Sequence, residues 1–277
     1  MAGDDRIQHL ADAVKYHREL YYNHSAPEIS DAEFDSLWDE LKSLDPDNSV
    51  LHEVGPEPLP GTAKVEHMFP MRSLDKGTND EDITHFVTQS TSGGTRYLAQ
   101  PKLDGSALSL EYVSGNLHRA ATRGSGERGE DVTLNAIQVA NIPTRLKYPY
   151  TIHVRGEVVM PLATFESKYR EVSPNPRNLC SGALRQKHGD GKADAADLVF
   201  CAYDVQFPSD PPTARYDSEL LHWLQEAGIE PAPWTIFESD RPQVEMIEHT
   251  REWLEKRPDY QFEIDGIVFK LDDLEQR

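Results

Sequence analysis

Lys102 stands between a proline and the run Leu103-Asp104-Gly105, directly before a stretch in which polar and apolar residues alternate. The alternation over 106–113 is typical of a half-buried strand and Asp104-Gly105 is typical of a turn, so we expect Lys102 where the chain enters a sheet. Such a lysine is either a surface charge or a positioned nucleophile. Because lysines are mostly exposed, Lys102 taken alone favours the surface charge.

Four other runs place charged or aromatic residues at or beside predicted strands: VRGEV at 154–158, NPRN at 175–178, FCAYDV at 200–205 and DGIVFK at 265–270. A lysine that attacks phosphorus must be neutral, whereas an ordinary lysine, with a pKa of about 10.4, is neutral in about one molecule in a few thousand at pH 7. A second lysine such as Lys270, arginines and a bound metal would lower that pKa and offset charge on the phosphate. Strand edges that converge on one cleft would give these runs a common chemistry.

Residues 124–129, GSGERG, match the dinucleotide pattern G-x-G-x-x-G. That pattern binds a dinucleotide when a buried strand precedes it and a helix follows it within a βαβ unit. The preceding run here is HRAATR. We therefore expect a turn or phosphate-contacting loop after a hairpin strand, in which the glycines only form the loop.

Composition limits the function classes. The chain has 277 residues, with 28 basic and 48 acidic side chains and a formal net charge of -20, which opposes extended contact with DNA phosphates. Two cysteines, Cys180 and Cys201, are too few for a disulfide framework or a thiolate zinc site. The sequence shows no signal peptide and no stretch long enough to span a membrane, so we expect a cytoplasmic protein without a structural metal.

The hydrophobic pattern divides the chain in two. Helical spacing from Ile7 and a capping-box signature at Ser30 and Glu33 predict a helical pair, and the proline- and glycine-rich stretch 54–61 marks a boundary between domains 1–60 and 61–277. We interpret 88–94 as a polar loop. The larger domain is predicted to be α+β, with a hairpin turn at 114–116 and strands at 106–113, 117–122, 151–159, 197–206 and 262–270.

Several of these motifs occur together in one known family. Lys102-Leu103-Asp104-Gly105, Arg123 in ATRG, Glu157 in RGEV, DGIVFK at 265–270 and APEISDAEFD at 26–35 resemble the NAD-dependent DNA ligases of bacteria, and the resemblance spans nearly the whole chain. It implies a helical unit that captures the nicotinamide mononucleotide (NMN) half of NAD. It also implies a nucleotidyltransferase (ATP-grasp-like) domain of antiparallel sheets flanked by helices.

The resemblance also implies a reaction and a set of site residues. Lys102 would attack the α-phosphate of NAD, release NMN and carry AMP to the 5′-phosphate of a nick, with Mg²⁺ as the metal and no metal-ligating residue assigned. Glu157 would bind ribose and Tyr203 would stack on adenine. The implied AMP and NAD contacts are Ser73, Leu74, Gln100, Leu103, Arg123, Glu157, Tyr203 and Lys270; the phosphate and supporting residues are Asp104, Arg177, Arg185 and Asp265; the NMN contacts are Tyr21, Tyr22, Asp31, Phe34 and Asp35.

The sequence departs from the family pattern at four positions. Tyr22 stands where the family usually has histidine, Phe34 where it has tyrosine, Gln100 where it has glutamate and Ser125 where aspartate is common. The family's last lysine-bearing strand and its DNA-binding domains are not found in these 277 residues. We therefore expect a monomer whose action on nicked double-stranded DNA needs further domains or a partner chain.

Plainer structural roles remain open for the same residues. Tyr21 and Phe34 could be core aromatics of the helical pair, and Asp31 could merely favour a helix N-terminus. Tyr203 could simply be packed, and a structural ion-pair network could account for Glu157, Arg177 and Arg185.

Three functions also remain: an NAD-using adenylating enzyme, an ATP-dependent ligase or capping-type nucleotidyltransferase, and a non-catalytic nucleotide-binding subunit of a split ligase. The helical unit favours NAD, because an ATP enzyme has no NMN to recognise.

Overall fold

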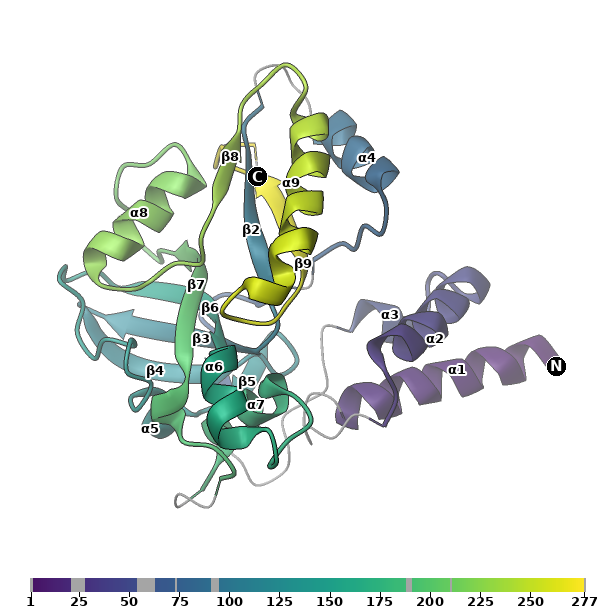
Figure 1. Cartoon of the computed structure of the whole chain (residues 1–277), viewed down its shortest axis with the longest axis horizontal. Helices are drawn as coiled ribbons and strands as arrows, with labels where there is room; N and C mark the ends of the chain where they lie inside the picture. The colour runs from purple at the N-terminus through teal and green to yellow at the C-terminus, as the bar shows by residue number, and fades with distance from the viewer. Residues whose placement is uncertain are drawn as a thin grey trace. The chain divides into compact units, whose positions relative to one another are not determined.

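The computed structural model describes residues 2–20, 28–53, 63–72, 74–90, 95–187, 191–209 and 211–276 (Figure 1). The chain forms two compact units. The first comprises Met1–Ser73 with Ala121–Asp131, and the second comprises Leu74–Ala120 with Val132–Arg277. The predicted domain boundary at residue 60 lies outside the described residues and stays a prediction.

The first unit contains the predicted helical pair, α1 (Ala2–Glu19) and α2 (Asp31–Leu44), followed by the short α3 (Ser49–His52). The capping box is confirmed, because the Ser30 hydroxyl accepts from the Glu33 amide while the Glu33 carboxylate accepts from the Ser30 amide. The helices enclose a small apolar core formed by Leu10, Ala11, Val14, Leu41 and Val50.

The first unit also holds a two-stranded antiparallel sheet of β1 (Lys64–Glu66) and β5 (Arg128–Glu130). The loop before β5 has Gly124 at φ 53° and Gly126 at φ 89°, which is backbone that glycine adopts without strain. A strand and not a helix follows, as expected for a loop outside a βαβ unit, but the motif is not all loop, because Arg128 and Gly129 already belong to β5.

A four-stranded antiparallel sheet, in the order β4-β3-β6-β7, forms the body of the second unit. Its strands are β3 (Ser106–Val113), β4 (Asn116–Thr122), β6 (Ile152–Val159) and β7 (Val199–Gln206), close to the predicted ranges. Ser114 and Gly115 both have positive φ, as a tight hairpin turn requires, so the predicted hairpin is also confirmed.

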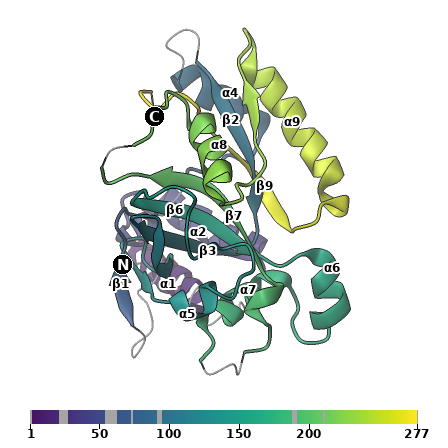
Figure 2. The same ribbon diagram turned by 90° about the vertical axis from the view of Figure 1, so that its left-hand side faces the viewer.

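A three-stranded antiparallel sheet, β8-β2-β9, completes the second unit. It is built from β2 (Tyr97–Leu103), β8 (Thr235–Phe237) and β9 (Ile264–Leu271). Lys102 therefore lies inside a strand and not at the entrance to a sheet, which corrects the prediction from its turn residues. Figure 2 shows β3 and β6 below β2 and β9.

Helices cover both sheets. On the three-stranded sheet, Val87 of α4 (Asp80–Ser90) and Met246 of α9 (Pro242–Lys256) pack against Tyr97 and Phe237. The main core unites the four-stranded sheet with α5 (Thr133–Ala136), α7 (Pro176–Arg185) and α8 (Asp217–Ala227). The remaining helical turns are α6 (Leu162–Thr164), a π-helix (Phe165–Tyr169) and 3₁₀ turns at Ala195–Asp197 and Arg257–Asp259.

The predicted loop 88–94 is wrong in its first part, since Thr88–Ser90 form the last turn of α4. The remainder, 91–94, lies outside the described residues. In the described part of the chain, no helix combines the length and the apolar character needed to cross a membrane.

Candidate functional site

A small apolar cluster joins the two sheets of the second unit. Leu103 and Ile264 come from the three-stranded sheet, whereas Val159 and Cys201 come from the four-stranded sheet; Ala232 and Phe262 complete the cluster. Lys102 precedes the cluster residue Leu103 in the sequence, and Glu157 pairs with the cluster residue Cys201 between β6 and β7. Packing of this cluster therefore fixes the two strands that carry them beside each other.

Lys102 lies on β2 opposite Gly266 of β9. The next ladder pair joins Leu103 to Ile264, so Asp265 is an extra residue in β9, a β-bulge. Without the bulge, the alternation of a strand would send Asp265 to the opposite face from Lys102. Instead its Oδ2 lies 2.5 Å from the Lys102 Nζ.

The Lys102 side chain keeps about half of its surface accessible at 49%. It is therefore a primary amine within reach of outside reactants and beside a carboxylate that can take a proton. That pairing is what nucleophilic attack by a lysine requires, because the amine must lose a proton before or during attack.

The turn after Lys102 passes very close to β6. A Cβ on Gly105 would lie 2.2 Å from the Val158 carbonyl oxygen and 3.0 Å from Glu157 Cγ, so only glycine fits. The Asp104 amide donates to the Glu263 carbonyl at 2.9 Å, which ties the turn to the approach of β9. The Lys-Leu-Asp-Gly run thus brings Lys102 toward Glu157 through backbone contact.

Glu157 sits in the middle of β6, paired with Ala107 on β3 and Cys201 on β7. Burial raises the pKa of the Glu157 carboxyl to about 7, an effect that the positive charges of Arg177 and Lys102 oppose and that Asp104 and Asp265 reinforce. Each of these four groups is near enough to exert a charge effect on Glu157, so five predicted site residues lie in one region of the second unit.

Arg177 reaches this group from α7. The NPRN run starts that helix: Asn175 is the N-cap, its side chain accepts from the Asn178 amide at 3.0 Å, and Pro176 occupies the first turn. Arg177 Nη1 lies 2.6 Å from Asp104 Oδ1. Arg185 ends the same helix eight residues on, about 12 Å along its axis from Arg177.

A second group of predicted residues lies further along the three-stranded sheet. The pairs Lys102–Gly266, Gln100–Val268 and Leu98–Lys270 place Lys102, Gln100 and Lys270 on one face, opposite the face that α4 and α9 cover. Lys270 is four residues from Gly266, or about 14 Å along the strand. Gln100 is buried, and its Nε2 donates to the Ala232 carbonyl at 3.3 Å.

Lys270 meets Tyr203, which is also a bulge residue. The ladder between β6 and β7 steps from Arg155–Asp204 to Gly156–Ala202, which leaves Tyr203 as the extra residue. The Lys270 Nζ donates to the Tyr203 carbonyl at 2.8 Å and lies 2.5 Å from Asp217 Oδ2. Sequence reasoning missed Asp217, because an acidic residue in the first turn of a helix is expected from the helix dipole alone.

The remaining predicted residues are not brought to this group by any described contact. Arg123 belongs to the first unit, where its Nε donates to the Met71 carbonyl at 3.4 Å. Leu74 is exposed in the second unit, and Ser73 lies outside the described residues.

In the helical pair, Tyr21 and Tyr22 lie outside the described residues, and Asp31 is the first residue of α2. Phe34 packs against the helical core with its ring centroid 6.2 Å from that of Trp38, as the core interpretation expected. Asp35 follows it on α2 and is partly buried.

The site offers carboxylates but no enclosed metal cage. Among the described residues, no group of three or more histidine, cysteine, aspartate or glutamate side chains is arranged to hold a metal ion. The arrangement instead suits a phosphate ester: an accessible amine with a proton acceptor, a buried carboxyl able to accept hydroxyl hydrogens, and cations on the same face.

Comparisons with known proteins cover the whole chain. A family model described as the NAD-dependent DNA ligase adenylation domain matches residues 61–277, and one described as the DNA ligase-like, N-terminal NAD+-binding domain matches residues 2–54. A DNA ligase of Brevibacillus brevis is 38% identical over 100% of this chain, and one of Treponema denticola is 35% identical over 99%. Both matches cover 43% of the relative, so the chain spans less than half their length.

Solved structures give a weaker likeness. A structure titled archaeal ATP-dependent RNA ligase has a TM-score of 0.43 and 14% identity, covering 70% of this chain and 43% of that chain. A likeness at this level carries no argument about the reaction.

Proposed function

Since the chain belongs to the family of NAD-dependent DNA ligases, as their N-terminal NAD+-binding and adenylation domains, we propose that Lys102 is the residue that takes AMP from NAD. The observation that carries this proposal is the position of the Lys102 amine, accessible and 2.5 Å from the Asp265 carboxylate, in a group with Glu157, Arg177 and Asp104.

The proposed step forms one bond and breaks one. The Lys102 Nζ attacks the α-phosphorus of NAD, a P–N bond forms, and the P–O bond to NMN breaks, so that NMN leaves as a phosphate monoester. The proton lost from Nζ goes to Asp265, the carboxylate nearest to it. AMP is then held on Lys102 as a phosphoramidate.

The other site residues hold the nucleotide in this proposal. Glu157 accepts hydrogen bonds from the ribose hydroxyls, Tyr203 stacks on adenine, and Lys270 meets phosphate or sugar on the face it shares with Lys102. The family relationship supports these roles, and the hydrogen bond from the Lys270 Nζ to the Tyr203 carbonyl brings these two residues together. Ser73, Leu74, Gln100, Leu103, Arg123 and Arg185 complete the proposed contacts, on the family resemblance alone.

We propose that the helical pair recognises NMN through Tyr21, Tyr22, Asp31, Phe34 and Asp35. The family model for the NAD+-binding domain covers this segment. Phe34 also packs in the helical core, so its replacement would affect both the stability of the helical pair and the binding of NMN.

Magnesium fits the donor set as a phosphate-bound ion. Mg²⁺ prefers oxygen ligands, keeps several waters and usually binds through one or two carboxylates together with substrate phosphates. Asp265 and Glu157 are the carboxylates that could serve. When bound, the ion neutralises charge on the phosphates.

The proposed acceptor of the AMP is the 5′-phosphate at a nick in double-stranded DNA. With a net charge of -20 the chain itself supplies little attraction for duplex phosphates. Because the chain spans 43% of the relatives' length, we propose that sealing requires the remaining ligase domains. The purified chain should then form an AMP adduct and give no sealed product on a nicked duplex in a gel assay.

Intact-mass measurement tests the reaction directly. The chain is incubated with Mg²⁺ and either NAD or ATP, and the mass of one AMP should appear with NAD alone. An adduct with ATP alone would identify an ATP-dependent nucleotidyltransferase, and no adduct with either would identify a non-catalytic nucleotide-binding subunit.

Lys102→Ala and Lys102→Arg should both abolish the adduct, since a guanidinium stays protonated and has no nucleophilic lone pair. The matched control is Lys168→Ala, because Lys168 is similarly exposed and also pairs with a carboxylate, Asp197, at 2.7 Å. An adduct that persists in Lys102→Ala at the wild-type rate would assign the chemistry to another residue.

NMN recognition has its own test. Asp35→Asn should raise the NAD concentration needed for half-maximal adduct formation, while Asp39→Asn, four residues on in the same helix and exposed, should not. Equal effects of the two variants would contradict the proposed role of Asp35.

A further inference from the structure

Among the described residues, the structure pairs the carboxylate of Asp217 with Lys270, and neither the sequence pattern nor the family motifs assigned Asp217 a role. We propose that Asp217 is a positioning residue for nucleotide transfer: it fixes the Lys270 ammonium so that its remaining N–H is directed to the phosphate or sugar of the bound nucleotide. This role rests on the proposed function, in which Lys270 contacts the nucleotide.

The pair is buried and has a definite geometry. The Lys270 Nζ lies 2.5 Å from Asp217 Oδ2, with side-chain exposures of 14% and 1%. The same Nζ donates to the Tyr203 carbonyl at 2.8 Å. An ammonium has three N–H groups, so two contacts from β7 and α8 leave one for a ligand.

This arrangement differs from ordinary helix capping. An acidic residue in the first turn of a helix stabilises it by lying near its free backbone N–H groups. The Asp217 carboxylate instead reaches the side chain of a lysine on another element, and the first N–H groups of α8 have separate acceptors. The Asp217 amide donates to the Asp272 carbonyl at 2.7 Å, and the Ser218 amide donates to Asp272 Oδ1 at 2.7 Å.

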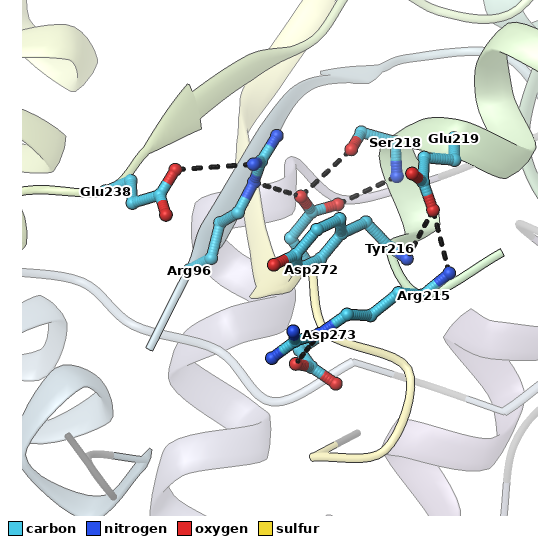
Figure 3. Close-up of polar contacts among 8 residues, drawn as sticks. All are labelled: Arg96, Arg215, Tyr216, Ser218, Glu219, Glu238, Asp272 and Asp273. Atoms are coloured by element: carbon cyan, nitrogen blue, oxygen red, sulfur yellow. Dashed lines mark hydrogen bonds and ion pairs between the residues drawn. The ribbon is translucent and has the colours of Figure 1, made fainter. Parts of the chain in front are cut away.

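Asp272 therefore anchors the start of α8 to the end of β9. It is fully buried, and its Oδ2 also accepts from the Ser218 hydroxyl at 2.9 Å, as Figure 3 shows. Lys270 and Asp272 are two residues apart, so both face α8 from the same side of the strand. The contacts of Asp272 thus hold α8, which carries Asp217, against β9, which carries Lys270.

Arg96 also contacts the junction between β9 and α8 that Asp272 forms. Its Nε lies 2.7 Å from Asp272 Oδ2, its Nη1 donates to Glu238 at 3.3 Å, and its guanidinium lies 4.4 Å from the ring centroid of Tyr216, the N-cap residue of α8 (Figure 3). A junction with this many contacts holds the Asp217 carboxylate in place before any nucleotide binds.

Preorganisation is what a lysine needs from its neighbours. Its four-carbon stem has many rotamers, and a ligand that had to select one would lose part of its binding free energy. A charged donor already aimed at a phosphate costs no reorganisation at the moment of reaction. The buried carboxylate supplies this order and also keeps the buried ammonium compensated.

A double-mutant cycle tests the proposal in the full chain. The measured quantity is the single-turnover rate of AMP adduct formation at saturating NAD, for wild type, Asp217→Asn, Lys270→Ala and the double variant. Groups that orient a ligand-binding side chain are worth about 10- to 100-fold in metal sites, and we expect Asp217→Asn to slow the adduct in that range. In the Lys270→Ala background the same substitution should cause no further slowing.

Ser218→Ala is the matched control, because it removes an adjacent junction contact and leaves the Asp217–Lys270 pair intact. It should lower the urea midpoint of unfolding and leave the adduct rate near that of wild type. Effects of Asp217→Asn and Lys270→Ala that multiply, or an adduct rate in Ser218→Ala as slow as in Asp217→Asn, would overturn the positioning role. A wild-type chain that forms no adduct would overturn the proposed function itself. An active wild-type chain in which the effects of Asp217→Asn and Lys270→Ala multiply would overturn only the positioning role.

Discussion

The ionisation of Glu157 should make the stability of the second unit depend on pH. Burial raises the pKa of this carboxyl from 4.5 to about 7. Between these values the folded chain binds a proton that the unfolded chain has released, so the stability is fully present below pH 4.5 and is lost as the pH rises through 7. Glu157→Gln cannot ionise and should escape this loss.

The size of the effect follows from the same values. One pH unit corresponds to about 1.4 kcal/mol, so a change from 4.5 to about 7 corresponds to at most about 3 kcal/mol. Part of the side chain remains accessible, which reduces the figure. Relative to wild type, Glu157→Gln should therefore gain about 2 to 3 kcal/mol between pH 4 and pH 8, with no further gain above pH 8.

Urea unfolding at several pH values provides the assay. The informative quantity is the difference in free energy of unfolding between variant and wild type, because effects common to both chains cancel. Glu226→Gln serves as the matched control, because it makes the same substitution at an exposed glutamate. A difference for Glu157→Gln that is the same at pH 4 and pH 8 would refute the buried, proton-binding state of Glu157.

Three other substitutions, the first with a matched control, test the local architecture. Gly105→Ala should lower the free energy of unfolding by about 1 to 3 kcal/mol through overpacking, since its Cβ would meet a backbone carbonyl at 2.2 Å. The control Gly182→Ala, with nothing within 4 Å of its Cβ, should raise the free energy of unfolding by up to about 1 kcal/mol. Equal effects of the two substitutions in urea unfolding would contradict the close approach at Gly105. Arg177→Met should raise the pKa of Glu157 further, because it removes the main opposing charge. The pKa is read from the pH dependence of the Glu157 carboxyl resonance in carbon NMR. An unchanged pKa would argue against an effect of Arg177 on Glu157. Ser30→Ala should cost about 1 kcal/mol by breaking the capping box of α2, and unchanged urea unfolding of the first unit would mean that the cap contributes little.

Local patterns in the sequence carried much of the fold. The alternation over 106–113 predicted β3 with its observed bounds, and the capping box at Ser30 predicted the start of α2. Both signals are local, since they depend on residues a few positions apart. Thr88–Ser90 are helical although serine favours turns and threonine has a low helix propensity, because packing of α4 through Val87 overrides these local preferences.

The strand that carries Lys102 was missed for a related reason. Pro101 lies within β2, and proline argues against a central strand because it lacks an N–H donor. The ladder with β8 ends at Ala99, so β2 is an edge strand on that side at Pro101 and loses no bond there. No local signal shows where a neighbouring strand will stop.

The site required information that strand periodicity does not contain. Asp265 and Tyr203 are bulge residues, and an extra residue in one strand is visible only against the register of its partner. The family resemblance named both residues without that geometry. It named Lys270 as well, but the carboxylate that pairs with Lys270 emerged only from the packing of α8 against β9.

Because β2 lies between β8 and β9, Lys102 gains its neighbouring strands and the Asp265 carboxylate only late in synthesis of the chain. Asp265 lies 163 residues after Lys102. At about 5 to 20 residues per second, a ribosome takes about 10 to 30 s to add them. Until β8 (Thr235–Phe237) is made, β2 has neither neighbour, and its backbone groups are open to chaperones or to the strands of other chains. The Lys102–Asp265 pair is therefore among the last features to form, so a nascent chain halted before β9 would carry Lys102 without the carboxylate that pairs with it.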